Sequence, residues 1–129
     1  MRVLVDSHAA LWWVANDERL SETARQTIAT ASDPLLSAVS LFEVAIKASL
    51  RKLPVAAEWA DKLLGNGFSL LPIGAAHGEE LHGLPFVKVN GATIRDPFDR
   101  MLVAQAHVEG VPVVTRDPAI AAHGVPTIW

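Results

Sequence analysis

Strand-like and helix-like segments alternate along almost the whole of this 129-residue chain. Short apolar runs, such as residues 2–6, are bounded by polar or turn residues and are typical of buried strands. The longer segments between them carry apolar residues at helical spacing. A strand followed by a crossover helix pairs in parallel with its neighbour, so alternation constrains the fold strongly. We expect an α/β protein, a three-layer α/β/α domain with a central parallel sheet of about five strands.

The boundaries follow from turn and capping signals. Strands are expected at residues 2–6, 35–38, 68–71, 111–115 and 127–129. Helices are expected at residues 8–15, 22–31, 40–50, 56–65, 75–82, 97–109 and 118–122. Asp-Pro at 33–34 and Asn-Gly at 90–91 predict turns, the second within a loop at 84–95.

Composition restricts the class of protein. The length suits one domain, which we expect to span residues 1–129, with 50% apolar and 19% charged residues. The absence of cysteine excludes disulfides, thiolate metal sites and thiol nucleophiles. We find no signal peptide and no run long enough to cross a membrane, so we expect a cytoplasmic protein without membrane contact. The net charge of −3 argues mildly against tight nucleic-acid binding by the bare protein.

Four acidic residues occupy positions that this fold would bring together. Asp6 ends the first strand, and Asp117 follows the strand at 111–115. Glu43 and Asp99 lie in the first turns of two expected helices. Ligands of parallel sheets bind outside the carboxyl ends of the strands, where the following helices also begin. Clustered carboxylates repel each other, and Mg²⁺ or Mn²⁺ relieves that repulsion with oxygen ligands. The placement indicates metal-dependent phosphoryl-transfer chemistry, with a nuclease as the leading hypothesis.

Each acid also has a purely structural explanation. Glu43 forms Ser-x-x-Glu with Ser40, and Asp99 stands in the same relation to Asp96, so both patterns resemble a capping box. Asp6 can cap the helix that follows it, and Asp117, directly before Pro118, can be a simple turn residue. Asp96 precedes a proline and is the acid most readily assigned to capping. An alternative is therefore a non-catalytic binding or regulatory module whose acids serve as caps.

Other phosphoryl-transfer motifs are missing. The chain has no phosphate-binding Gly-x-x-x-x-Gly-Lys loop and no Gly-x-Gly-x-x-Gly segment. A phosphoryl-accepting receiver domain would need adjacent acids after its first strand and an aspartate after its middle strand. Leu71-Pro72-Ile73 offers none at the latter position.

Four segments, in their order along the chain, resemble the PIN-domain ribonucleases. They are Val-Asp-Ser-His-Ala-Ala-Leu-Trp-Trp, Ser-Leu-Phe-Glu-Val-Ala-Ile-Lys, Arg-Asp-Pro-Phe-Asp-Arg-Met-Leu-Val-Ala-Gln-Ala and Val-Val-Thr-Arg-Asp. The resemblance covers nearly the whole chain, and Asp-Pro-Phe-Asp-Arg is its most specific part. Within this family the chain is similar to the VapC-type toxins of bacterial type II toxin–antitoxin pairs.

The resemblance implies an endoribonuclease that uses Mg²⁺ or Mn²⁺, frequently forms homodimers and is neutralised by a small VapB-type antitoxin. It implies four catalytic and metal-binding acids, Asp6, Glu43, Asp99 and Asp117. Thr115 matches a residue that supports this site. Ser40 and Asp96 are expected to support it as well. The candidate contacts to RNA phosphates are Lys47, Arg95, Arg100 and Arg116, each of which has an alternative role as a surface charge or ion-pair partner.

The adjacent Trp12 and Trp13 point in different directions from one short helix. Together with Leu11 they give this helix more apolar surface than it can bury on one face. We predict that Trp12 or Trp13 lines an apolar groove near the acids, into which an antitoxin docks. The competing interpretation is that both indoles pack inside the protein.

Overall fold

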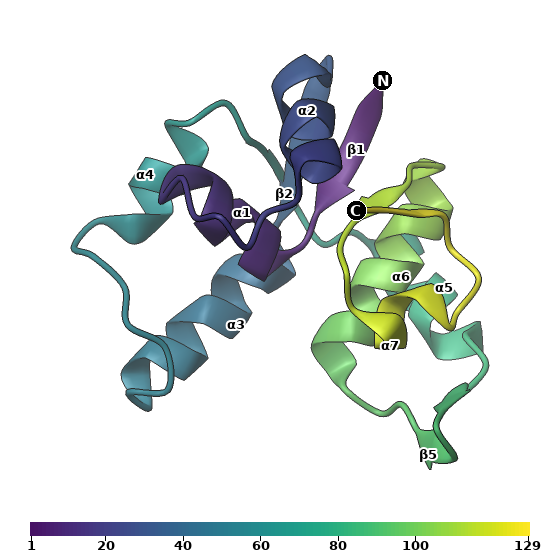
Figure 1. The fold of residues 1–129 in the computed structure, drawn as a ribbon. Helices are drawn as coiled ribbons and strands as arrows, with labels where there is room; N and C mark the ends of the chain where they lie inside the picture. The colour runs from purple at the N-terminus through teal and green to yellow at the C-terminus, as the bar shows by residue number, and fades with distance from the viewer.

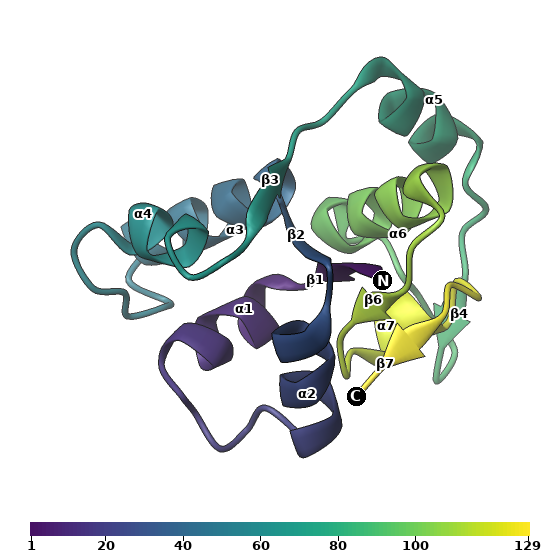
Figure 2. The ribbon, with the colours of Figure 1, turned by 90° about the horizontal axis from the view of Figure 1, so that it is seen from above.

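The computed structural model describes all 129 residues and contains a five-stranded parallel sheet, as predicted. Its strand order is β3-β2-β1-β6-β7, so β1 lies at the centre. Figure 1 shows β1 beside β2, and Figure 2 shows the whole order. The strands are β1 (Arg2–Val5), β2 (Asp33–Ser37), β3 (Ser69–Leu71), β6 (Val113–Val114) and β7 (Thr127–Ile128). A separate two-stranded hairpin consists of β4 (Lys88–Val89) and β5 (Ala92–Thr93).

Helices cover both faces of the sheet, which makes the fold a three-layer α/β/α structure. One layer contains α1 (Ser7–Val14), α2 (Glu22–Thr30) and α4 (Trp59–Leu64). The opposite layer contains α5 (Ala75–Gly83), α6 (Pro97–Glu109) and α7 (Pro118–Ala121). The view from above separates these two groups (Figure 2). The remaining helix, α3 (Ala38–Ser49), contacts both α1 and α6. None of the helices combines the length and apolar character that a membrane span requires.

Strand β1 divides its side chains between the two cores. Val3 and Val5 join the core beneath α1 and α2, whereas Leu4 joins the core beneath α6 and α7. All three are completely buried. Successive side chains of a strand point to opposite faces, so a continuous apolar run is what a centrally placed strand needs. Burial of each such side chain contributes about 1.5–3 kcal/mol to folding.

The predicted turn at Asp33-Pro34 is wrong, because both residues belong to β2. Asp33 and Pro34 lie opposite Arg2 and Val3 in the parallel pairing with β1. Proline has no amide hydrogen to donate, but near the start of a strand it can be accommodated. The pairing therefore begins earlier than the local sequence indicated.

The predicted helix start at Ser40 is also wrong. The α3 helix begins at Ala38, and the Ser37 hydroxyl caps it by accepting a hydrogen bond of 3.0 Å from the Val39 amide. Ser40 is instead buried inside the helix. Both serines match the preference for a cap, and only the end of β2 decides between them.

The predicted turn at 90–91 is confirmed, within a hairpin that the sequence did not reveal. Asn90 and Gly91 both have positive φ values, 51° and 80°. Positive φ at both central residues is typical of the tight turn that joins two hairpin strands. The hairpin stands directly before α6, so no strand of the main sheet leads into that helix.

Candidate active site

The carboxyl ends of β1 and β6 lie side by side and position two of the predicted acids. Val5 pairs with Val114, so Asp6 and Asp117 leave adjacent strands at the same edge of the sheet. The chain order reverses at β1, between β2 and β6. Such a reversal opens a crevice at the carboxyl edge in parallel α/β folds.

Thr115 joins the two acids. Its hydroxyl donates a hydrogen bond to Oδ2 of Asp6 and accepts one of 3.0 Å from the backbone amide of Asp117. Each acid also caps a helix through Oδ1, which accepts from the Ala9 amide at 2.8 Å for Asp6 and from the Ala119 amide at 2.9 Å for Asp117. The cap considered for Asp6 is therefore present, and Asp117 caps α7 where the sequence suggested a simple turn.

Glu43 is buried on α3 and is fixed from two sides. The Ser7 hydroxyl donates a hydrogen bond of 3.0 Å to its carboxylate, and Lys47 forms an ion pair of 3.1 Å with it. No capping box joins Glu43 to Ser40, since Ser40 is not at the helix start. The buried Ser40 hydroxyl has no hydrogen-bond partner.

Asp99 differs from the other acids because no hydrogen bond or ion pair holds its carboxylate. The cap of α6 is Asp96, which is exposed and accepts a 2.8 Å hydrogen bond from the Phe98 amide. The pKa of Asp99 is raised to about 7, first by burial and then by the charges of Asp96, Asp117, Glu43 and Asp6, in that order.

The electrostatics of Asp99 show that the four predicted acids share one region of the molecule. The pKa of Asp6 is also raised, mainly by burial, against the opposing effect of its hydrogen bond from Thr115. No three or more of the acidic and histidine side chains, however, have the spacing of a ready-made metal-ligand group. The structure therefore contains a repulsive carboxylate cluster, not a closed metal cage.

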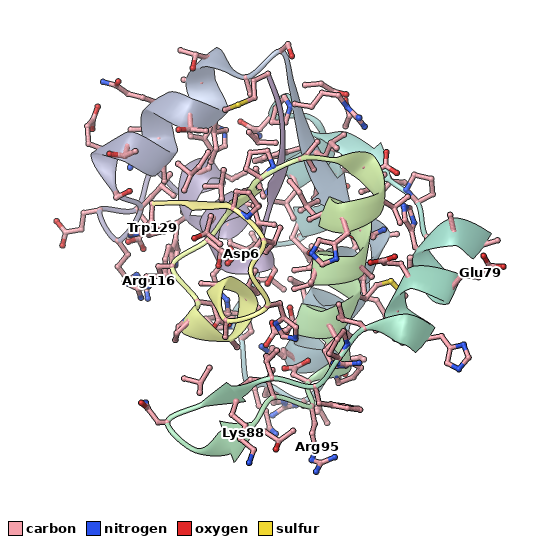
Figure 3. The ribbon with its side chains drawn as sticks, turned by 90° about the vertical axis from the view of Figure 1, so that its right-hand side faces the viewer. Asp6, Glu79, Lys88, Arg95, Arg116 and Trp129 are labelled. Carbon is pink, nitrogen blue, oxygen red and sulfur yellow. The ribbon has the colours of Figure 1, made fainter.

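The four predicted phosphate contacts occupy different environments. Lys47 is half-exposed and paired with Glu43, and Arg95 is exposed beside the hairpin, away from Asp6 (Figure 3). Arg100 is buried, donates to the backbone carbonyls of residues 84 and 85 at 2.9 and 3.2 Å, and stacks on a phenylalanine ring. Its guanidinium therefore holds a loop in place, a structural role that the sequence did not predict. Arg116 is exposed next to Asp117.

A hollow of about 500 Å³ opens beside the acids, and we call it the Trp12–Trp129 hollow. Its lining residues are Asp6, His8, Trp12, Arg19, Arg116, Asp117, Pro118 and Trp129. Figure 3 shows Arg116 and Trp129 on the side of the molecule where Asp6 lies. Sequence reasoning did not assign Arg19 or Trp129 to the site. Among the basic and aromatic residues of this hollow, Arg116 was the one with a local sequence signal, its position directly before Asp117.

A second hollow of about 520 Å³ is largely apolar and lies between α1 and α4, so we call it the α1–α4 groove. Its apolar lining includes Leu11, Trp12, Val14, Leu53, Val55 and Trp59. Of the two indoles predicted to line a groove near the acids, Trp12 is the one that does so. Trp13 lines neither hollow and packs, half-buried, against the core beneath α1.

Comparison with known proteins assigns this architecture to a family. The family model for the PIN domain matches residues 3–125. The chain is 31% identical to Ribonuclease VapC22 from Mycobacterium tuberculosis, over an alignment that covers 98% of each protein.

Two solved structures share the fold at low sequence identity. The first is VapBC2 from Rickettsia felis bound to a DNA fragment from their promoter, with a TM-score of 0.65 at 11% identity, over 98% of this chain and 97% of that one. The second is DNA-bound VapBC from Salmonella typhimurium, with a TM-score of 0.65 at 14% identity, over 98% and 96%.

Proposed function

This chain belongs to the PIN-domain family, and from that premise we propose that it is a metal-dependent endoribonuclease acting as the toxin of a toxin–antitoxin pair. The observation that carries the proposal is the convergence of Asp6, Glu43, Asp99 and Asp117 on one region, where burial and then the neighbouring charges raise the pKa of Asp99 to about 7. The similarity to a protein named as a ribonuclease supports RNA as the substrate.

The residues fit Mg²⁺ or Mn²⁺ better than a metal that requires a protein cage. Magnesium keeps several waters and is usually bound by one or two carboxylates together with substrate phosphates. A loose cluster with unbalanced negative charge meets this need, although it lacks the spacing of three fixed ligands. Asp99 and the unbonded Oδ2 of Asp117 are the most available oxygens.

The chain's own residues hold the reacting groups in position. Thr115 and the two helix caps fix Asp6 and Asp117, and Ser7 with Lys47 fixes Glu43. Fixed carboxylates lower the cost of organising the site. A bound divalent ion would supply an activated water and stabilise charge on the scissile phosphate.

The test is cleavage of a structured RNA by the purified protein, with Mg²⁺ or Mn²⁺ and with chelator. We expect chelator to abolish cleavage. We expect Asp99→Asn to reduce the cleavage rate by at least 100-fold, on the order of the loss of one well-placed group that stabilises the transition state. Asp61→Asn is the matched control, because Asp61 is an exposed aspartate in the first turn of α4, and it should retain activity. Cleavage that continues unchanged in chelator, or in Asp99→Asn, would refute the metal mechanism. Induced expression in a bacterial host should arrest growth, and Asp99→Asn should relieve the arrest.

The alternative, a non-catalytic module, draws support from the caps made by Asp6, Asp96 and Asp117. Calorimetric titration with Mn²⁺ separates the two. Binding that disappears in Asp99→Asn favours the enzyme, since Asp99 has no capping role. No heat of binding at millimolar Mn²⁺ favours the module.

We propose that the partner of the toxin is a small VapB-type antitoxin that docks an apolar helix in the α1–α4 groove and places a basic side chain among the acids. The apolar lining, with Trp59 opposite α1, suits a helix with anchored apolar side chains. The VapBC names of the two similar structures support such a partner. Trp59→Ala should weaken binding of the antitoxin encoded in the adjacent reading frame, and unchanged affinity in a folded variant would contradict the docking site.

We also propose a homodimer. Exposed apolar side chains such as Phe42, Leu70 and Ile73 leave surface that a second copy can cover. Light scattering coupled to size-exclusion chromatography measures the mass directly, and a monomer at all concentrations would refute this state.

A further inference from the structure

The Trp12–Trp129 hollow has a chemistry that the four acids do not explain. Its lining combines aromatic rings and guanidinium groups with the carboxylates of Asp6 and Asp117. Its volume of about 500 Å³ falls within the range of small-ligand sites. A ligand in this hollow would touch the proposed reaction site directly.

Trp12 is the centre of the aromatic group. The ring of Trp129 meets it edge-on at 5.9 Å, and His8 is tilted against it at 5.8 Å. The guanidinium of Arg116 lies over Trp12 at 4.6 Å and also over Trp129 at 5.9 Å. The guanidinium of Arg19 lies over Trp12 at 4.9 Å. Guanidinium groups stack on aromatic faces and also recognise phosphates.

The two arginines are in different bonding states. Arg19 is paired with Asp17 at 2.8 Å, so its charge is already balanced. Arg116 has no carboxylate partner and makes no hydrogen bond, although two indoles restrict its position. A guanidinium that is exposed, oriented by aromatic rings and not paired with a carboxylate is suited to an anionic, planar ligand.

We propose that this hollow binds one unpaired nucleotide of the RNA next to the scissile phosphate. The base stacks on the surface formed by Trp12, Trp129 and Arg116, and Arg116 also faces the adjoining phosphate. The inference rests on the proposed ribonuclease function and adds to it a stacking site for one base beside the acids.

An unpaired base fits better than a duplex. In a helix the faces of each base are covered by its neighbours, whereas loops and bulges present bases that stack on aromatic rings or guanidinium planes. Stacking tolerates all four bases because each has a π-face. The hollow therefore selects RNA structure more than base identity.

The experiment compares two labelled RNA decamers in chelator, where no cleavage occurs. One is an adenylate decamer, and the other has the same phosphates and riboses but no bases. Fluorescence anisotropy measures the binding of each to the full chain. We expect the wild-type protein to bind the adenylate decamer about 5- to 150-fold more tightly than the abasic one.

Two variants separate stacking from charge. Trp129→Leu removes the ring, and Arg116→Lys keeps the charge but loses the plane. Both variants should bind the two decamers with affinities that differ by no more than about 2-fold. Arg116→Lys should leave binding of the abasic decamer unchanged. Phe86→Leu is the matched control, because Phe86 is an exposed ring with two guanidiniums over it elsewhere on the chain. It should keep the wild-type preference.

The proposal is overturned if wild-type protein binds both decamers equally, which would leave the hollow to a side chain of a protein partner. It is equally overturned if Arg116→Lys and a folded Trp129→Leu keep the preference, or if Phe86→Leu loses it. The cleavage assay keeps the two proposals distinct. Metal-dependent cleavage without base preference removes only the nucleotide site, whereas base preference without cleavage removes only the ribonuclease.

Discussion

Replacing Asp99 by asparagine should stabilise the protein in metal-free buffer above neutral pH. The Asp99 carboxylate makes no hydrogen bond or ion pair, while burial and four neighbouring acids oppose its ionisation. Asparagine has nearly the same shape and no charge, so the repulsion disappears without a cavity. Asp6 and Asp117 are less suitable for this test, because each also caps a helix.

The magnitude follows from the pKa. A value of about 7 against the ordinary 3.8 is a difference of about three units, which for a fully buried group corresponds to roughly 4 kcal/mol. Asp99 is only partly buried, so solvent screening reduces the effect. We expect Asp99→Asn to raise the free energy of unfolding by about 1–2 kcal/mol at pH 8.

The pH dependence has a definite sign. Because the folded pKa of Asp99 lies above the unfolded value, the folded state binds more protons between about pH 4 and pH 7. Its contribution to stability is therefore present at low pH and is lost as the pH rises through 7. The difference between Asp99→Asn and wild type should be near zero at pH 4 and complete at pH 8.

Urea denaturation at pH 4.5, 6, 7 and 8 measures this difference, with Asp61→Asn as the control, because Asp61 is an exposed first-turn aspartate of α4 and does not contribute to the raised pKa of Asp99. Added Mg²⁺ should stabilise wild type and leave Asp99→Asn nearly unchanged, since ligands that bind only the folded state raise its stability. A variant that is less stable than wild type at pH 8, or a difference that does not vary with pH, would refute the repulsion argument.

Three further predictions concern side chains whose hydrogen bonds hold the fold and the site in place. Arg100→Lys should destabilise the protein by about 1–3 kcal/mol in thermal melts, because lysine cannot reproduce the two hydrogen bonds to loop carbonyls, while Arg95→Lys should have no effect. Thr115→Val should cost about 1–3 kcal/mol, since it leaves two site groups without their bridging hydroxyl, and should lower any RNA cleavage rate. The pKa of Glu109 is lowered by its hydrogen bonds, first the one with His77 and then the one with Arg2. The stabilisation that Glu109→Gln removes should therefore be present at pH 7 and shrink as the pH falls below about 4, and denaturant titrations measure it.

The sequence predicted the parts of the site that depend on the sheet. Asp6 and Asp117 follow apolar runs whose alternation with helices is strong, and parallel pairing then places them at one edge. The start of α3 was missed because Ser37 and Ser40 are equally good caps, and the choice depends on where β2 stops pairing with β1. Capping preference is local information, whereas strand pairing is not.

The Trp12–Trp129 hollow could not be predicted for a related reason. Trp129 reaches Trp12 only because β7 adds to the sheet next to β6, and no local pattern predicts that pairing. Arg19 lies in the connection after α1, where its position depends on Asp17. Contacts between residues more than a hundred positions apart depend on the completed sheet order, which composition and periodicity do not determine.

Capping does not distinguish a structural acid from a functional one in this protein. Asp6 and Asp117 each use Oδ1 for a helix cap, and Asp117 keeps Oδ2 free of any hydrogen bond or ion pair. One carboxylate can therefore fix a helix with one oxygen and present the other to a ligand. Asp99 is the informative residue, because it contributes no bond to the fold and its charge is unfavourable where it lies. An acid that costs stability and supports nothing structural is what a ligand-binding site retains, so the variant that separates the enzyme from the module is Asp99→Asn.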